Sequence, residues 1–388
     1  MNRTTINSSL PLIAIFLAVG LVLSGRYRAD AHSQSTAFLN LKADHSLVQG
    51  EWHLALRDLE DAVSIDRNDD GMITWDELRL RKEAICAYAL SRLHVRSKAD
   101  EGRIRVVDFL VDKHADGAYA VIRFVIDGVS HQEKLRLDYG AFFEIDPKHR
   151  GLFSLQTGGR TQTGVFSPEN PTQQFELNDN NNKVPSSFPA FVKEGIWHIW
   201  SGYDHMLFLL ALLLPGVLRR RNGTWEPVPA AKVAVVAVLK IVTAFTVAHS
   251  ITLSLSVLGI IQLPTRLIES AIAASVAIAA LNNLLPFYSE RGWAVAFGFG
   301  LLHGFGFANA LRDLGLHQGQ LATTLFGFNL GVELGQLAIV GIFLPLALSV
   351  RCLLFYPRVL VRLASAVIML VSTTWFAERI LDFKWLPF

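Results

Sequence analysis

The C-terminal half of the chain places histidines and carboxylates inside long apolar stretches, where an ionisable side chain is costly and indicates function. His198, Asp204 and His205 lie close together in the first of these stretches. Neutral imidazoles combined with a carboxylate are good ligands for nickel, cobalt, zinc or copper. We therefore predict a site for a divalent transition metal, as substrate or cofactor, with the ligands His198, Asp204, His205, His249, His303 and Glu333.

These ligands come from separate apolar stretches but share a depth. At about 1.5 Å per residue, His205, His249, Glu269, His303 and Glu333 lie roughly 6–17 Å below the outer ends of their helices. Scattered structural polar groups have no reason to share one layer, so the pattern favours a common site. For any single histidine, an interhelical hydrogen bond is the alternative. Secondary candidates are Glu269, Asn329 and Asn309.

A second set of metal ligands lies in the segment 66–77, DRNDDGMITWDE, which has the spacing of an EF-hand calcium loop. Ca²⁺ prefers six to eight hard oxygen ligands, and the loop needs glycine at the sharp turn in position six. Gly71 occupies that position. A loop of this shape that does not bind calcium is the alternative. The predicted ligands are Asp66, Asn68, Asp70, the Met72 carbonyl, Thr74 and Glu77.

The elements that position the first set of ligands are predicted membrane helices. A spanning helix needs about 20 mostly apolar residues, and six stretches qualify. Glycines at 298, 300, 304 and 306 let the fourth stretch pack closely against its neighbours. The predicted spans are 196–218, 234–258, 265–287, 292–313, 323–349 and 357–378.

Charge predicts the orientation of these spans. Cytoplasmic loops carry an excess of Lys and Arg, and the loops after the first, third and fifth spans carry most of them. We therefore predict a multi-pass protein of the bacterial inner (plasma) membrane with a periplasmic N-terminal domain. The residues behind this prediction are Arg219, Arg220, Arg221, Lys232, Arg291, Arg351, Arg358 and Arg362.

The N-terminal residues 1–31 have the pattern of a signal peptide. Arg3 precedes an apolar run at 10–23, and Ala29-Asp30-Ala31 offers a cleavage site. An uncleaved signal anchor is the alternative. Cleavage after Ala31 exposes His32, whose α-amine and imidazole can together chelate copper or nickel. An N-terminal histidine with no such role is the alternative, and His32 is a secondary site candidate.

Residues 32–177 predict a small β-rich extracytoplasmic domain, most simply an antiparallel sandwich. Period-two alternation runs through 35–56, 103–113, 119–127 and 134–145. A helical pattern follows the calcium loop from Leu78 to Leu90. A polar linker at 178–190 separates this domain from the membrane domain at 191–388. The predicted fold class is thus an all-α polytopic membrane bundle preceded by a β-rich domain with an EF-hand insertion.

Composition limits the partners. Charged residues make up 18% of the chain, against about 25% in a typical soluble domain. The net charge of +2 argues against nucleic acid. Cys86 and Cys352 indicate neither a disulfide framework nor a cysteine-based zinc site. The expected partners are membrane lipid and a metal ion, while a periplasmic protein partner and homo-oligomerisation are left open.

The polar residues of the first and fourth predicted spans resemble the motifs of the HupE/UreJ family of membrane proteins. The run from His198 to Asp204-His205 matches the first motif, His-x5-Asp-His. His303-Gly304 matches part of the second, F-H-G-x-A-x-G-x-E, but Ala310 replaces its closing acid. The resemblance covers about residues 190–380. It implies a nickel or cobalt permease of the long form that carries an exported domain.

The leading hypothesis is therefore a divalent-metal permease. His198, Asp204 and His205 would capture the ion from the periplasmic side, and His249, His303 and Glu333 would pass it inward. The first alternative is an intramembrane zinc-dependent hydrolase acting on a lipid-like substrate. The second is a docking or assembly module in which the membrane bundle serves only as an anchor.

Overall fold

The computed structural model describes residues 35–44, 47–97, 100–114, 117–128, 134–158, 160–177, 188–221, 224–285, 292–308, 311 and 318–381. They form two compact parts, a β-rich part within His32–Phe191 and a helical part within Val192–Ala308 and Gly327–Phe388. The predicted signal peptide, His32, Asn309 and residues 178–187 of the predicted linker lie outside the described residues.

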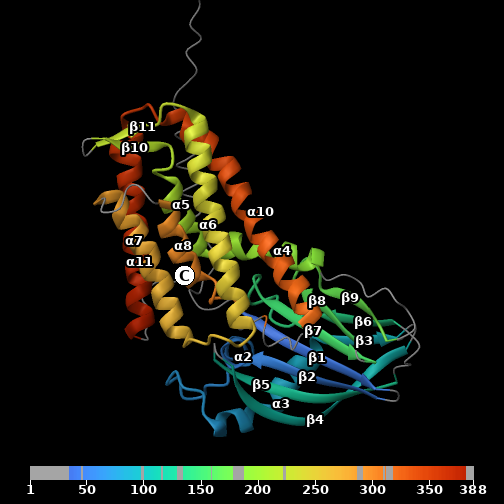
Figure 1. Ribbon diagram of the computed structural model, residues 1–388. Helices are drawn as coiled ribbons and strands as arrows, with labels where there is room; N and C mark the ends of the chain where they lie inside the picture. The colour runs from blue at the N-terminus through green and yellow to red at the C-terminus, as the bar shows by residue number, and fades with distance from the viewer. Residues whose placement is uncertain are drawn as a thin grey trace, which may run out of the picture. The chain divides into compact units, whose positions relative to one another are not determined.

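The β-rich part is built on a mixed sheet (Figure 1) with the strand order β8-β7-β1-β2-β5-β4-β3-β6-β9. Its strands are β1 (Thr36–Asp44), β2 (Leu47–Ala55), β3 (Leu93–Ser97), β4 (Asp100–His114), β5 (Gly117–Asp127), β6 (Lys134–Tyr139), β7 (Arg150–Thr157), β8 (Arg160–Phe166) and β9 (Thr172–Glu176).

The predicted alternation correctly identifies the buried face of the sheet, because Val48, Trp52, Leu54, Ile122 and Phe124 are all in the core. Several details of the prediction are wrong. In place of a sandwich, the described residues of the β-rich part form one sheet of nine strands. The run at 134–145 is a strand only as far as Tyr139. The run at 35–56 is two strands and the first residue of a helix. The sheet is also not wholly antiparallel, since β1 and β7 pair in parallel. Alternation reports the face that a residue occupies, and it does not report the partner of its strand.

The sheet curls toward closure. A bulge between Val106 and Asp108 interrupts the pairing of β4 with β5, and a bulge bends a strand. The two edge strands are then joined by a glutamine. Gln162 donates from Nε2 to the Glu176 carbonyl at 2.5 Å and accepts from the Glu176 N–H at 3.0 Å. This bonding covers part of both edges.

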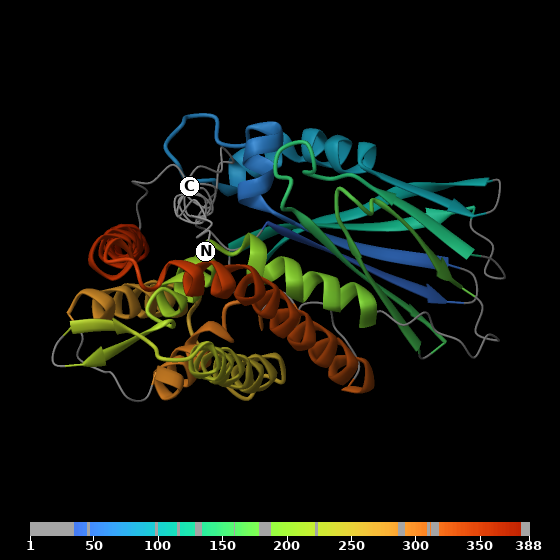
Figure 2. The same cartoon turned by 90° about the horizontal axis from the view of Figure 1, so that it is seen from above.

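Two helices pack on the sheet, α2 (Leu56–Val63) and α3 (Trp75–Ser91) (Figure 2). Leu59 of α2 and Ile85 of α3 are fully buried in the same hydrophobic core as the sheet residues. The helix predicted after the calcium loop is confirmed as α3. It begins with a capping box, in which Thr74 and Glu77 bond reciprocally to each other's backbone N–H.

A buried polar chain crosses the β-rich part. Ser35 Oγ donates to Asp58 Oδ2 at 2.7 Å and lies 2.5 Å from His149 Nδ1. Because the serine proton is given to Asp58, the imidazole Nδ1–H donates to Ser35. His149 Nε2 then accepts from the Tyr139 hydroxyl at 2.8 Å. The imidazole is completely buried, and both ring nitrogens are paired.

Among the described residues, the helical part contains α4 (Phe188–Ser201), α5 (Tyr203–Leu213), α6 (Ala231–Val257), α7 (Thr265–Leu284), α8 (Gly292–His303), α10 (Gln318–Val350), the short π-helix η1 (Tyr356–Leu360) and α11 (Val361–Leu381). A hairpin of β10 (Leu218–Arg221) and β11 (Thr224–Pro227) connects α5 to α6.

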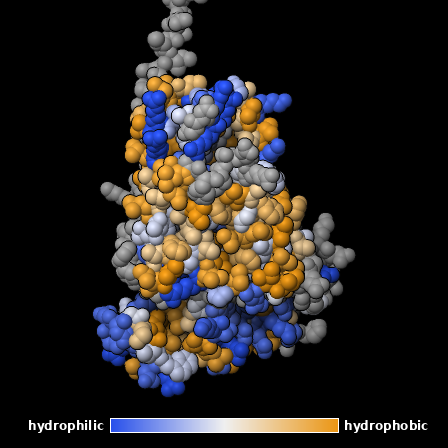
Figure 3. Space-filling view, turned by 60° about the vertical axis from the view of Figure 1, so that its left-hand side comes forward, coloured by the Kyte–Doolittle hydropathy of each residue, from blue (hydrophilic) through white to orange (hydrophobic). Residues whose placement is uncertain are grey.

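Among the described residues, four helices are long and apolar enough to cross a membrane: Ala231–Val257, Thr265–Leu284, Leu321–Val350 and Tyr356–Leu381. Their outward-facing side chains are largely hydrophobic, as Figure 3 shows for one face. The other two predicted spans are not long continuous helices. The first is divided at Gly202 into α4 and α5, and α8 ends at His303 before a turn.

Candidate metal centre

The break between α4 and α5 brings His198 and His205 together. A Cβ on Gly202 would lie 2.8 Å from the His198 carbonyl oxygen and 2.9 Å from His205 Nδ1. Only glycine therefore fits this connection without a shift of backbone. The chain bends here, and the two imidazole centroids are 4.6 Å apart. The bend and the helical spacing of the first motif together bring His198 and His205 into contact.

Close contact between α6 and α8 supplies two more histidines. A Cβ on Gly300 would clash with Phe245, and a Cβ on Gly304 would clash with Thr252 and the His249 carbonyl. The predicted close packing is confirmed at these two glycines. It is wrong at Gly298, which has nothing within 4 Å of a Cβ in the described part of the chain. Small residues let helix backbones approach in a membrane, and here they bring His249 and His303 into the same layer.

Three buried imidazoles, from α5, α6 and α8, lie near the partly buried His198 of α4. The centroid of His205 lies 5.0 Å from that of His303 and 6.3 Å from that of His249. His198 lies 6.2 Å from His249. Ligand atoms of His198, His205 and His249 all lie within 4.8 Å of one another, and so do those of Asp204, His205 and His303.

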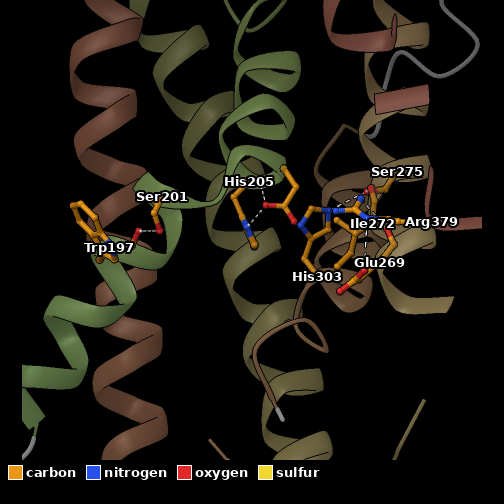
Figure 4. Close-up of polar contacts among 9 residues, drawn as sticks. Trp197, Ser201, His205, Glu269, Ile272, Ser275, His303 and Arg379 are labelled. Atoms are coloured by element: carbon orange, nitrogen blue, oxygen red, sulfur yellow. Dashed lines mark hydrogen bonds and ion pairs between the residues drawn. The ribbon is translucent and has the colours of Figure 1, made fainter. Parts of the chain in front are cut away.

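Hydrogen bonds assign the protons of three of these rings. Asp204 Oδ1 lies 3.0 Å from His205 Nδ1 and accepts its proton. His249 Nδ1 lies 3.4 Å from Asn329 Oδ1 and donates to it. Ser275 gives its hydroxyl proton to the Ile272 carbonyl, so its oxygen accepts from His303 Nε2 at 3.0 Å (Figure 4).

The other nitrogen of each ring is then a lone-pair donor. His205 Nε2, His249 Nε2 and His303 Nδ1 are buried and have no hydrogen-bond partner among the described residues, and the same holds for His198 Nε2. A buried polar atom without a partner is costly. His198, His205 and His249 form one group of ligand atoms, and His303 joins it through the group that shares His205. Unpaired imidazole nitrogens grouped in this way are an arrangement that a metal ion would satisfy. Asp204, Asn329 and Ser275 orient these imidazoles, as outer-shell groups do at metal sites.

Aromatic rings enclose the cluster. Phe245 lies 5.3 Å from His303 and Phe208 lies 5.0 Å from it, between ring centroids. Phe307 and Phe328 stack on each other and lie 5.0 and 5.3 Å from His198. These rings pack against the imidazoles and limit how they can turn.

The predicted carboxylates divide into one that joins the cluster and two that do not. Asp204 bonds to His205. Glu333 instead accepts from Thr243 Oγ1 at 3.2 Å, and Glu269 pairs with Arg379 at 3.7 Å. Asn329, a secondary candidate, reaches the cluster through His249. The depth that these residues share along their helices therefore did not distinguish the side chains that join the histidine cluster from those that pair elsewhere.

A small cavity lies beside His205, between α4, α5, α6 and α10. It is mostly apolar, with Gln336 as the other polar residue in its lining. Gln336 accepts from the Thr246 hydroxyl at 2.9 Å. Leu212 and Ile241 also line this cavity.

A family model described as HupE / UreJ protein matches residues 173–379, slightly more than half of the 388 residues. The chain belongs to the HupE/UreJ family. Its match includes all four histidines and Asp204, while the calcium-loop segment and most of the β-rich part precede it. No curated protein matches the chain. The family membership and the four apolar helices make this HupE/UreJ chain a membrane protein.

In this HupE/UreJ chain, residues 66–74 of the segment 66–77 lie in the loop between α2 and α3, and residues 75–77 form the first turn of α3. Asp66 Oδ2 accepts from the Gly71 N–H at 2.8 Å, and Asp70 Oδ1 accepts from the Met72 N–H at 2.8 Å. Gly71 has a φ of 79°, which a glycine adopts without strain. Glu77 folds back onto the loop and accepts from the Arg67 and Thr74 N–H groups at 3.0 and 2.9 Å. Asp66, Asp70 and Glu77 thus all turn toward the loop.

Sequence reasoning missed several residues of these sites. Gly202 and Ser275 carry no metal-ligand signal of their own, and their roles depend on close approach and on a single hydrogen bond. A second group of ligand atoms, from His53, Asp112 and His114, lies in the β-rich part. His53 and His114 are far apart in the sequence, so only the strand pairing reveals it.

Proposed function

We propose that this protein is a permease for nickel- or cobalt-like divalent transition-metal ions. The observation that carries the proposal is the set of four buried imidazole nitrogens without hydrogen-bond partners in the described structure, which belong to two groups of ligand atoms that share His205. Such a set suits an ion that prefers nitrogen ligands. Membership of the HupE/UreJ family, whose model covers these residues, supports the same function.

The character of the ligands favours release over permanent retention. Four neutral imidazoles leave most of the ion's charge uncompensated, and Asp204 is the carboxylate nearest to them in the described clusters. Burying charge without compensation is costly. An ion held in this way can leave more easily than one held by thiolates or several carboxylates, as transport requires.

Polar pairs along α6 and α10 supply an onward path. His249 meets Asn329, Thr246 meets Gln336, and Thr243 meets Glu333. Polar groups inside a membrane are expensive and mark ion pathways. An anchor would need none of them, which is why a docking module is the weaker explanation. Glu333 would act along this path and not as a ligand in the cluster.

A catalytic zinc site keeps an open coordination position beside three protein ligands. The two groups of ligand atoms share His205, so further donors lie beside either set of three. Such an arrangement suits an ion that passes between ligands better than a catalytic ion with a fixed open position. We further propose that α4 with α5, and α8 with the residues after it, also lie within the membrane. The chain would then cross it six times, with the β-rich part on the periplasmic side as the Lys and Arg distribution predicts.

The loop at 66–77 is proposed to bind Ca²⁺ in the β-rich part. Asp66, Asp70 and Glu77 each accept hydrogen bonds from backbone N–H groups of the segment, which holds it in a compact turn and supports this assignment. Extracytoplasmic calcium modules bind at about 10⁻⁴–10⁻³ M, so we assign the ion a structural role.

Uptake of Ni²⁺ into vesicles containing the full chain tests the permease proposal. The wild type should load an enclosed metal-sensitive dye, and His205→Ala with His249→Ala should abolish loading. His94→Ala, an exposed histidine of β3, is the matched control and should load normally. Uptake that survives loss of the two cluster histidines would contradict the proposal. Stoichiometric metal retained after chelator dialysis, without uptake, would point to a metalloenzyme instead.

A further inference from the structure

Three side chains with metal-ligating atoms lie on one face of the sheet in the β-rich part. His53 belongs to β2, and Asp112 and His114 belong to β4. The strand between them, β5, places Val121 opposite both His53 and Leu110. Cross-strand partners share a face, and so do alternate residues of one strand. Leu110, Asp112 and His114 therefore point to the same side as His53.

The ligand atoms of these three residues are close enough to hold one ion. His53 Nδ1 lies 3.0 Å from His114 Nε2, and the ligand atoms of all three residues lie within 4.8 Å of one another. Two imidazole nitrogens bound to a tetrahedral Zn²⁺ are about 3.3 Å apart, given Zn–N bonds of about 2.0–2.1 Å. The observed separation therefore needs little change to accommodate an ion.

The same separation also suits a hydrogen bond between the two rings. The hydrogen-bonded pair and the metal-bound pair differ in which ring nitrogens carry the protons. Metal binding needs the lone pair of His53 Nδ1, which places that ring's proton on Nε2. His53 Nε2 faces Glu51 Oε2 at 3.9 Å, and Arg123 holds the other oxygen of Glu51 at 2.7 Å. The separation of His53 Nε2 from Glu51 Oε2 is too long for a hydrogen bond, but a negative charge on this side of the ring favours a proton on Nε2.

Packing fixes the second imidazole. The His114 ring stacks on Phe38 at 5.4 Å and 13°, and its centroid lies 4.2 Å from that of Tyr119. Phe38 and Tyr119 are themselves buried. Asp112 is exposed, so a hydrated ion can reach the group directly from solvent. The site is thus preorganised on its apolar side and open on the other.

We propose that His53, Asp112 and His114 form a second site for a divalent transition metal such as Zn²⁺, with water completing its coordination. Two imidazoles and a carboxylate form a donor set that such ions accept. The site is separate from the helical histidine cluster and from the calcium loop. It does not depend on the permease proposal, because it rests on the strand register and side chains of the β-rich part.

Equilibrium dialysis of Zn²⁺ against the full chain in detergent, after chelator treatment and with Ca²⁺ present, tests this site. The wild type should bind two Zn²⁺ ions. The double variant His53→Ala/His114→Ala should bind one, and His205→Ala/His249→Ala should also bind one. His94→Ala should bind as the wild type does. Unchanged stoichiometry in His53→Ala/His114→Ala would overturn the proposal, whatever the helical variants do.

A second measurement guards against misfolding of the double variant. Asp112→Asn changes an exposed side chain, and it should weaken binding at this site at least about tenfold. In the His205→Ala/His249→Ala background, the electron paramagnetic resonance spectrum of bound Cu²⁺ should show coupling to two nitrogens. A Cu²⁺ spectrum without coupling to two nitrogens would contradict the assignment. So would Zn²⁺ affinity that Asp112→Asn leaves unchanged.

Discussion

Asp204 Oδ1 accepts hydrogen bonds from both the backbone N–H and the Nδ1–H of His205, at 2.9 and 3.0 Å. This relationship makes Asp204 a residue that orients His205, although the motif spacing alone suggested a direct ligand. The hydrogen bond also occupies Nδ1 of the His205 imidazole, which leaves Nε2 to bind an ion.

Asp204→Asn should therefore weaken Ni²⁺ binding at the histidine cluster by about 10–100-fold, the usual cost of losing an outer-shell partner. His205→Ala should abolish binding there. Titration calorimetry on the full chain, in the His53→Ala/His114→Ala background, measures both. Glu269→Gln is the matched acidic control, since Glu269 pairs with Arg379 and should leave affinity unchanged. Equal losses in Asp204→Asn and His205→Ala would make Asp204 a ligand.

Alanine substitutions at Gly304 and Gly298 should have different effects on stability and on Ni²⁺ binding. A Cβ at 304 would meet the His249 backbone, whereas a Cβ at 298 has open space in the described structure. Gly304→Ala should force α8 away from α6, cost about 1–3 kcal/mol as overpacking does, and weaken Ni²⁺ binding. Gly298→Ala should retain both stability and binding. Thermal unfolding with and without Ni²⁺ checks this, and equal behaviour of the two variants would contradict the packing.

Features that depend on neighbours in the chain were predicted from the sequence, whereas features that join distant segments were not. Strand alternation correctly marked Trp52 and Phe124 as buried, because it depends on neighbours in the chain. The parallel pairing of β1 with β7 was missed because it joins distant segments. Likewise, the histidines of the cluster were predicted from their cost inside apolar stretches, whereas the outward pairing of Glu333 with Thr243 depends on how α6 and α10 face each other.

The buried chain from Asp58 to Tyr139 predicts sensitivity to acid. Burial lowers the pKa of His149 to about 3, with Arg150 adding to the effect. The unfolded chain protonates this imidazole near pH 6.5. Stability is therefore full above about pH 6.5 and decreases as pH falls toward 3, by at most about 1.4 kcal/mol per pH unit. Burial raises the pKa of Asp58, which favours the folded state at lower pH and opposes part of this loss.

Hydrogen exchange of β7 amides in the full chain, corrected for intrinsic rates, measures this dependence. The wild type should lose protection between pH 6.5 and 4. His149→Phe should be less stable at pH 7 but should lose less protection over the same range, because the titrating group is gone. His94→Ala should leave the wild-type dependence intact. A His149→Phe profile parallel to that of the wild type would exclude His149 as the cause.

The loop at 66–77 predicts a calcium-dependent gain in stability. At a Ca²⁺ concentration about 100 times the dissociation constant, binding to the folded state alone contributes about 2.7 kcal/mol. The melting temperature of the β-rich part should therefore rise with Ca²⁺ in the wild type and not in Glu77→Gln. Asp76→Asn, an exposed neighbour outside the predicted ligand positions, should keep the rise. A wild-type melting temperature that does not change with Ca²⁺ would contradict the calcium assignment.

X-ray absorption at the metal edge of the Zn²⁺-loaded full chain, in the His53→Ala/His114→Ala background, tests the histidine cluster most directly. We predict a first shell of about four nitrogens at about 2.0–2.1 Å, with scattering from imidazole rings. His249→Ala should reduce that imidazole scattering. A first shell of oxygens alone, or imidazole scattering that is unchanged in His249→Ala, would contradict the metal centre on which the proposed function rests.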